Sequence, residues 1–294
     1  MLITTLAILL LLYGFTPRGT LLHEAIHLSW FWLSALLASK EPTSCRKVQY
    51  GPHPRQYYLL CLPPDGKVRR KTLLLYFHGG SWRWGKPEFF KAHAGFFNRL
   101  GYAVALPSYR PCPQHDYRHI RADLAATLEK VYQQIAAEEL PCRRAVTGGM
   151  SAGGHLAMVS ALSTDWHPSC LPEGWIAGCF ALGAPLHLSA MPHSFILEDF
   201  AGPRHEPLFE RASPYSYAKE RPGLPVLVVH GTHDGMVAYQ STKGFVRRRK
   251  LLPATPLTFV KIEKGTHLKV ASWIFQRGKT RAALEKWLAE HATD

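Results

Sequence analysis

The chain has 294 residues, of which 47% are hydrophobic and 19% charged, a composition that excludes a disordered, collagen-like or small disulfide-rich protein and suits one or at most two globular domains. Its 35 Lys and Arg against 21 Asp and Glu leave a net charge of +14, which attracts nucleic acid, anionic lipid or acidic substrates without choosing among them. Only Arg18 and Glu24 are charged before residue 40, so the excess charge belongs to residues 40–294.

The amino-terminal segment is apolar. Residues 2–15 form an uncharged run, and a second apolar stretch occupies residues 21–38. The first run is short for a bilayer span but long enough for the apolar core of a signal peptide. Because no cation precedes it and no clear cleavage site follows it, we expect residues 1–39 to be a retained membrane anchor rather than a cleaved signal. The excess of cations over acids in residues 40–71 favours the cytoplasmic face for the following domain. The periplasmic or secreted side stays open.

Residues 23–27 read His-Glu-Ala-Ile-His, which matches the H-E-x-x-H pattern of zinc peptidases. No convincing third ligand follows it, and we interpret the pattern as part of an amphipathic or interfacial helix. We therefore expect no metal at this pattern. The six cysteines contain no C-x-x-C pair, and we expect them to be mostly core thiols, with their pairing and the redox compartment left open.

From residue 47 onward, short apolar runs alternate with helical patterns. This alternation predicts an α/β fold, with a mainly parallel sheet and helices on both faces. An antiparallel pair over 47–62 opens the sheet. The expected strands are 72–77, 102–106, 145–147, 176–182, 225–230 and 257–262, and the expected helices are 118–138, 152–163, 238–250 and 270–291. Residues 183–224 are too long for a simple connection and are predicted to form a small lid over a pocket.

A serine lies at the junction of a strand and a helix, in Gly149-Met150-Ser151-Ala152-Gly153. The pattern G-x-S-x-G makes a sharp turn that lifts the serine hydroxyl above the sheet, and glycines flank it because larger side chains would collide. By itself the motif is weak. The strand before Ser151 and the small residues after it make this serine the candidate nucleophile.

A second glycine-containing turn follows the expected strand 72–77, in His78-Gly79-Gly80-Ser81-Trp82. Glycines after an apolar strand leave backbone N–H groups open to a reacting carbonyl oxygen. We expect the N–H groups of Gly79, Gly80 and Ala152 to form an oxyanion hole, the alternative being an ordinary Gly-Gly turn.

Two more polar residues follow strand ends. Asp234 comes after strand 225–230 and His267 after strand 257–262. With Ser151 they form the chain order Ser, Asp, His of an α/β-hydrolase triad, in which His267 takes the serine proton and Asp234 orients the imidazole.

The sequence offers other acids and bases for the same roles. Glu263 and Asp165 are alternative acids, and His230 and His233 are alternative bases. Glu263 lies on the histidine's own strand, Asp165 is expected at the opposite end of the sheet, and both histidines lie on the acid's own strand or loop. Asp234 and His267 are therefore preferred.

These motifs together resemble the α/β-hydrolase superfamily over residues 70–290, and within it the H-G-G-x-W branch. That branch includes hormone-sensitive-lipase-like esterases, feruloyl- or acetyl-esterase-like bacterial enzymes and kynurenine formamidases. The further matching motifs are Ser108-Tyr109-Arg110-Pro111, Ser213-Pro214, His230–Asp234 and Gly265–His267. The resemblance implies ester or aryl-formamide hydrolysis through an acyl-enzyme without a cofactor. Ser81 replaces the third glycine of lipase-like members, which favours the formamidase and short-acyl esterase pattern.

The function that we expect is hydrolysis of a small carboxylic ester by a serine hydrolase. An arylformamidase acting on an N-formylkynurenine-type amide is the alternative, and a catalytically idle binding module is a second one. Trp82, beside the oxyanion turn, and Met150 are candidate pocket residues.

The basic runs 67–71 and 247–250 are interpreted first as solvated faces. Contact with an anionic membrane surface is the next interpretation. No nucleic-acid motif accompanies the charge, so no nucleic-acid partner is expected. The oligomeric state is not determined by the sequence.

Overall fold

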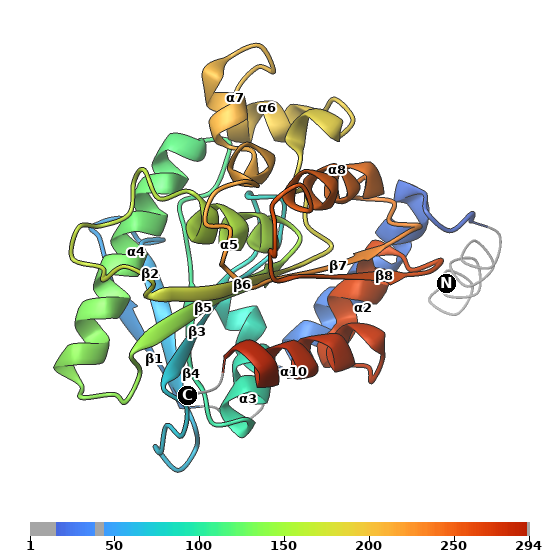
Figure 1. Ribbon diagram of the computed structural model, residues 1–294. Coiled ribbons are helices and arrows are strands. Elements are labelled where there is room, and N and C mark those ends of the chain that lie inside the picture. The colour runs from blue at the N-terminus through green and yellow to red at the C-terminus, as the bar shows by residue number, and fades with distance from the viewer. Residues whose placement is uncertain (1–15, 39–43, 293–294) are drawn as a thin grey trace.

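An eight-stranded sheet forms the centre of the computed structural model, which describes residues 16–38 and 44–292 (Figure 1). The strands follow the order β1-β2-β4-β3-β5-β6-β7-β8, and β2 pairs antiparallel with both of its neighbours while the other pairs are parallel. The strands are β1 (Ser44–Gln49), β2 (Tyr57–Leu62), β3 (Thr72–Phe77), β4 (Ala103–Pro107), β5 (Arg144–Met150), β6 (Ile176–Leu182), β7 (Val226–Gly231) and β8 (Leu257–Ile262). The predicted fold class and the antiparallel opening pair are confirmed.

Helices cover both faces of this sheet. The α-helices are α2 (Leu21–Ala38), α3 (Lys91–Arg99), α4 (Tyr117–Ala137), α5 (Ala152–Leu162), α6 (Phe195–Ala201), α7 (Pro207–Arg211), α8 (Tyr239–Arg249), α9 (His267–Ala271) and α10 (Lys279–His291). Short 3-10 helices are η1 (Pro87–Phe90), η2 (Leu188–Ala190), η3 (Pro214–Tyr217) and η4 (Ser272–Ile274). The single helix expected over 270–291 is instead divided among α9, η4 and α10, and α3 was not expected.

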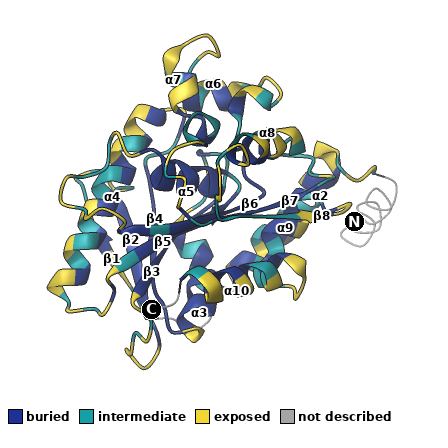
Figure 2. Ribbon diagram, in the orientation of Figure 1, coloured by how far each residue is buried: buried dark blue, intermediate teal, exposed yellow. Residues whose placement is uncertain are grey.

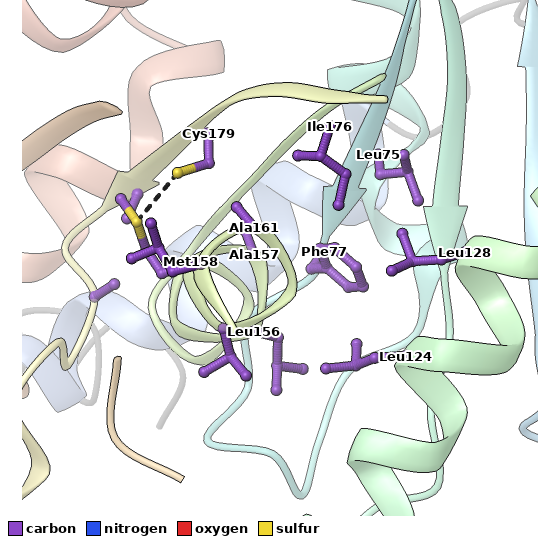
Figure 3. Close-up of a cluster of buried hydrophobic side chains, with 14 of the residues drawn as sticks. Leu75, Phe77, Leu124, Leu128, Leu156, Ala157, Met158, Ala161, Ile176 and Cys179 are labelled. Atoms are coloured by element: carbon purple, nitrogen blue, oxygen red, sulfur yellow. Dashed lines mark hydrogen bonds between the residues drawn. The ribbon is translucent and has the colours of Figure 1, made fainter. Parts of the chain in front are cut away.

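Two apolar clusters fill the space between the sheet and these helices, so that dark buried segments line both faces of the strands (Figure 2). One cluster joins the sheet to α4, α5 and α8, and the other joins it to α3, α9 and α10. Figure 3 shows the first, where Leu124 and Leu128 of α4 approach Phe77 of β3. In the same cluster the Cys179 thiol lies 3.4 Å from the Met158 sulfur.

Three of the six cysteines are buried thiols, as the sequence suggested: Cys112, Cys142 and Cys179. Cys170 is an exposed thiol. Cys45 and Cys61 face each other across β1 and β2 and form a disulfide that joins the edge strand to the sheet.

The expectation of a membrane anchor is contradicted. Within the described ranges 16–38 and 44–292, no helix combines the length and apolar character needed to cross a membrane. The apolar stretch 21–38 instead forms α2, which packs against α9, α3 and η1 and buries Phe31 and Ala35. Residues 2–15, the other part of that prediction, lie outside the described residues. The assignment to a membrane, and with it to a cytoplasmic face, is therefore wrong because the apolar face of α2 is used by the protein itself.

Basic residues of the run 247–250 do not all face solvent. Arg247 is exposed, but Arg249 is fully buried. The Arg249 guanidinium donates to the carbonyl oxygens of Ala218, Glu220, Arg221 and Leu224 at 3.0–3.1 Å. This side chain holds the segment before β7 to α8, because it supplies donors to four carbonyl groups, of which those of Ala218 and Leu224 are bonded in buried surroundings. The interpretation of the whole run as a solvated face is wrong for Arg249.

Candidate active site

Ser151 occupies a tight turn between β5 and α5. Its φ of 53° lies in the left-handed region, which a residue with a side chain adopts at a cost. The turn needs glycines on both sides: a Cβ at Gly149 would lie 2.6 Å from the carbonyl oxygen of Phe77, and one at Gly153 would lie 2.1 Å from the same atom. The G-x-S-x-G pattern therefore has the steric reason that the sequence suggested.

The loop after β3 brings Gly79 and Gly80 beside this turn. A Cβ at Gly79 would lie 3.4 Å from the Ser151 Cβ. Gly80 has a φ of +122°, and a Cβ there would lie 2.2 Å from the Trp84 carbonyl oxygen, so only glycine fits. The backbone N–H of Ala152 belongs to the first turn of α5, whose N–H groups have no partner within the helix.

His78 begins this loop and is fully buried. Burial lowers its pKa to about 3, although a hydrogen bond with the Gly79 carbonyl opposes that shift. The imidazole Nδ1 lies 2.8 Å from that oxygen, and the ring stacks on Tyr109 with centroids 4.6 Å apart. His78 is thus a neutral side chain that supports the glycine loop.

Asp234 and His267 meet at the ends of β7 and β8. His267 Nδ1 lies 2.7 Å from Asp234 Oδ2, and both side chains are buried. The other carboxylate oxygen, Oδ1, accepts from the backbone N–H groups of Met236 at 2.9 Å and Val237 at 2.7 Å. His230 Nε2 also approaches Asp234 Oδ2, at 3.3 Å. The aspartate is therefore held from several sides and presents one oxygen to the His267 imidazole.

Electrostatics shift both groups toward their charged forms. Burial raises the Asp234 pKa, but His267 and His230 outweigh it, so that the pKa lies below its usual value. Burial lowers the His267 pKa, but the charge of Asp234, its hydrogen bond and the charge of Glu24 together raise the pKa above its usual value. The pair thus favours an imidazolium beside a carboxylate.

The alternative acids and bases lie elsewhere. Asp165 hydrogen bonds to Ser163 at the far end of α5, and Glu263 pairs with Lys261 at the surface. His233 is exposed. His230 is buried and bonds through Nδ1 to Thr242 at 2.7 Å, beside Asp234 rather than in the cavity that Ser151 lines.

One cavity of about 260 Å³ unites the candidate nucleophile and base. Its polar corner is formed by Gly79, Gly80, Ser81, Ser151 and His267. Its apolar lining consists of Leu28, Phe31, Trp32, Trp84, Phe90, Met150, Met236 and Leu268. The structure thereby brings together Ser151, His267, the two glycines and the candidate pocket residue Met150.

Trp82, the other candidate pocket residue, is not part of this lining. It is buried and stacks on Phe200 with ring centroids 4.0 Å apart and an interplanar angle of 8°. Trp84, two residues later, lines the cavity instead. The turn after Gly80 reverses the chain, which directs Trp82 toward the insertion and Trp84 toward the cavity.

The insertion 183–224 contains α6 and α7, which lie above α5 in Figure 1. Its contacts with the loop after β3 include an ion pair between Asp199 and Arg83, next to the stacked pair Phe200 and Trp82. It contributes none of the lining of the cavity at Ser151. Residues of α2 line the cavity instead, although the sequence predicted a membrane anchor for this helix. The sequence signal for this role is the spacing of Leu28, Phe31 and Trp32, which puts them on one face of the helix.

Comparisons with known proteins agree with this geometry. Residues 74–185 match a family model described as an alpha/beta hydrolase fold. The probable carboxylic ester hydrolase LipM of Mycobacterium tuberculosis is 26% identical over 263 residues, covering 83% of this chain and 60% of that protein. Esterase LipC of the same organism is 24% identical, covering 76% and 59%. The chain thus spans about three fifths of the length of these curated relatives.

Solved structures share the fold. Thermogutta terrifontis esterase 2 phosphorylated by paraoxon superposes with a TM-score of 0.65 and 23% identity, covering 84% of this chain and 91% of that one. A truncated carbohydrate esterase from gut microbiota gives a TM-score of 0.72 with 16% identity, covering 87% and 98%. With its sheet order and its serine at the β5–α5 turn, the chain has the α/β-hydrolase fold.

Proposed function

We propose that the protein is a serine hydrolase that cleaves a small carboxylic ester. The observation that carries this proposal is the single cavity lined by Ser151 and by His267, whose imidazole contacts the buried Asp234. The similarity to proteins named carboxylic ester hydrolase and esterase supports the same reaction type.

In the proposed mechanism, Ser151 Oγ attacks the acyl carbon while its proton moves to His267 Nε2. Asp234 holds the other ring nitrogen, Nδ1, as the donor and stabilises the imidazolium that forms. The imidazolium then gives its proton to the leaving alcohol, and an acyl-enzyme remains. Water, deprotonated by His267, attacks that ester and releases the carboxylic acid and free Ser151.

The negative charge of each tetrahedral intermediate falls on the former carbonyl oxygen. We assign its stabilisation to the backbone N–H groups of Gly79, Gly80 and Ala152. Fixed donors of this kind require no reorganisation during the reaction, and loss of one costs roughly 10²–10³ in kcat.

The cavity bounds the substrate. Its volume of about 260 Å³ is slightly below the roughly 300–1,000 Å³ typical of pockets for drug-sized ligands, so we infer a short acyl or a single aromatic group. Phe31, Trp32, Trp84 and Phe90 give it an aromatic lining. That lining also favours the second candidate, hydrolysis of an N-formyl aromatic amine by the same residues.

The test uses the full chain. p-Nitrophenyl acetate, butyrate and octanoate and N-formylkynurenine are assayed beside Ser151→Ala, and paraoxon labelling is located by mass spectrometry. We expect turnover of the short esters and one phosphoryl adduct on the peptide containing Ser151.

Ser189→Ala is the matched control, because Ser189 is exposed on the insertion and outside the cavity. It should behave as the wild type. Turnover that persists in Ser151→Ala would refute the nucleophile, and preference for N-formylkynurenine would favour the formamidase. A wild type that neither turns over nor reacts with paraoxon would indicate a binding module.

A further inference from the structure

The carboxylate of Glu24 is buried at the carboxyl end of the sheet although Glu24 belongs to the amino-terminal helix α2. The side chain is fully inaccessible to solvent. Its Oε1 accepts from the backbone N–H of His267 at 2.5 Å and of Gly235 at 3.3 Å, and its Oε2 accepts from that of Leu268 at 3.1 Å. One carboxylate thus joins the segment that follows Asp234 to the segment that begins with His267.

These contacts meet a need of α9. His267 and Leu268 are the first two residues of this short helix, whose first N–H groups have no partner within it. The side-chain hydroxyl of the N-cap residue Thr266 accepts from the backbone N–H of Lys269, at 3.3 Å. Glu24 supplies the missing acceptors from a distant part of the chain.

The same face of α2 carries the wall of the cavity. Leu28, Phe31 and Trp32 follow Glu24 by four, seven and eight residues, the spacing of one helix face. All three line the cavity at Ser151. The contacts of Glu24 that hold α2 in place therefore also hold the cavity wall that α2 provides.

We propose that Glu24 is a positioning residue that holds His267 in register with Asp234 and fastens α2 to the active site. The proposal rests on the proposed hydrolase function for its kinetic consequence. The Glu of the H-E-x-x-H pattern then acts on the histidine of another segment and not on a metal-bound water.

Two charged groups act on the His267 imidazole: Asp234, which follows β7, and Glu24, which comes from α2. His230, at the end of β7, approaches Asp234 Oδ2. Burial lowers the pKa of His267, and Asp234 raises it by its charge and its hydrogen bond. The charge of Glu24 adds a smaller increase in the same direction as Asp234. Removing that charge should lower the pKa.

The experiment compares Glu24→Gln with the wild type in the full chain. A glutamine has nearly the same shape, but its amide NH₂ cannot accept from one of the N–H groups that the carboxylate serves. We expect kcat for p-nitrophenyl butyrate to fall by about 10- to 100-fold, because the base is displaced. The KM should change little, and the acid limb of the pH–rate profile should move to lower pH.

Glu263→Gln is the matched control, since it removes an exposed carboxylate from the loop that leads from β8 to His267. It should leave kcat and the profile unchanged. A second readout needs no activity: NMR titration of His267, assigned with His267→Gln, should give a lower pKa in Glu24→Gln and an unchanged one in Glu263→Gln.

The outcomes separate the two proposals. A folded Glu24→Gln with wild-type kcat and an unchanged His267 pKa would overturn the role of Glu24. A wild type that is inactive toward every ester, with the His267 pKa still lowered in Glu24→Gln, would overturn the hydrolase function and support the positioning role.

Discussion

His267 Nδ1 lies 2.7 Å from Asp234 Oδ2, and both side chains are removed from solvent. Because the pair stabilises its charged forms, the pKa of His267 is raised and that of Asp234 lowered. The contact between these two residues determines how the protein should respond to pH.

The proposed base must be neutral to accept the proton of Ser151. We therefore expect kcat/KM for p-nitrophenyl butyrate to rise with pH through a midpoint above about 6.5, the ordinary histidine value. The free energy of unfolding should change with pH in the opposite direction to the activity. A raised His267 pKa stabilises the folded state fully below about pH 6.5, and that contribution is lost as the pH rises through the folded-state pKa. Denaturant unfolding between pH 5 and 9 should show this loss in the wild type and a flatter profile in His267→Gln.

The carboxylate contributes at the acid end. A lowered Asp234 pKa gives stability that is present above about pH 4, the unfolded value, and is lost as the pH falls through the folded value. Asp234→Asn should therefore have a flatter acid limb of unfolding free energy than the wild type. Equal acid limbs in the two proteins would contradict this assignment.

Gly80→Ala should abolish most of the activity. A methyl group there would lie 2.2 Å from the Trp84 carbonyl oxygen, and the φ of +122° is unfavourable for alanine. The loop must therefore move, and its N–H groups would no longer point at the oxygen of the tetrahedral intermediate. We expect kcat to fall by about 100-fold or more. Gly174→Ala is the control, because Gly174 also has a positive φ of 74° but no atom within 4 Å; it should lose some stability and keep kcat. Equal kcat losses in both variants would show that the effect is not local.

Trp32→Ala should broaden the acyl preference. The indole forms part of the cavity wall on α2, and its removal should raise the ratio of kcat/KM for octanoate to that for butyrate by about tenfold. Leu33→Ala changes the neighbouring residue of the same helix, which is exposed and outside the cavity, and should leave the ratio unchanged. An unaltered ratio in Trp32→Ala would place the acyl group elsewhere.

Arg249→Met should destabilise the fold. The substitution leaves four carbonyl groups, two of them bonded in buried surroundings, without their donor, and we expect a loss of about 3 kcal/mol or more in the free energy of unfolding. Arg247→Met, at an exposed position two residues earlier, should change it by less than about 0.5 kcal/mol. Thermal unfolding of both variants measures the difference. Equal melting temperatures of the two variants would contradict a stabilising role for the Arg249 hydrogen bonds.

The strands were predictable because their signal is local. Residues 72–77, 176–182 and 257–262 were expected as strands and have those bounds in the structure. The first two are short apolar runs, the pattern of a buried parallel strand. The third is the partly buried edge strand β8. The helix over 270–291 was predicted as one piece, although residues 276–281 carry no apolar side chain and include Gly278; the structure separates η4 from α10 at this point.

For the candidate site, the sequence by itself determined the nucleophile turn, the glycine loop and the order Ser151, Asp234, His267, because each motif follows a strand whose end is locally encoded and parallel strands end at one edge of a sheet. Their catalytic roles stay a prediction. Only the tertiary structure decided where α2 lies. An apolar stretch records that a surface must be covered and not what covers it, so the same residues fit a bilayer or a protein groove. The buried contacts of Glu24 with Gly235, His267 and Leu268 exist only once the two ends of the chain have packed together.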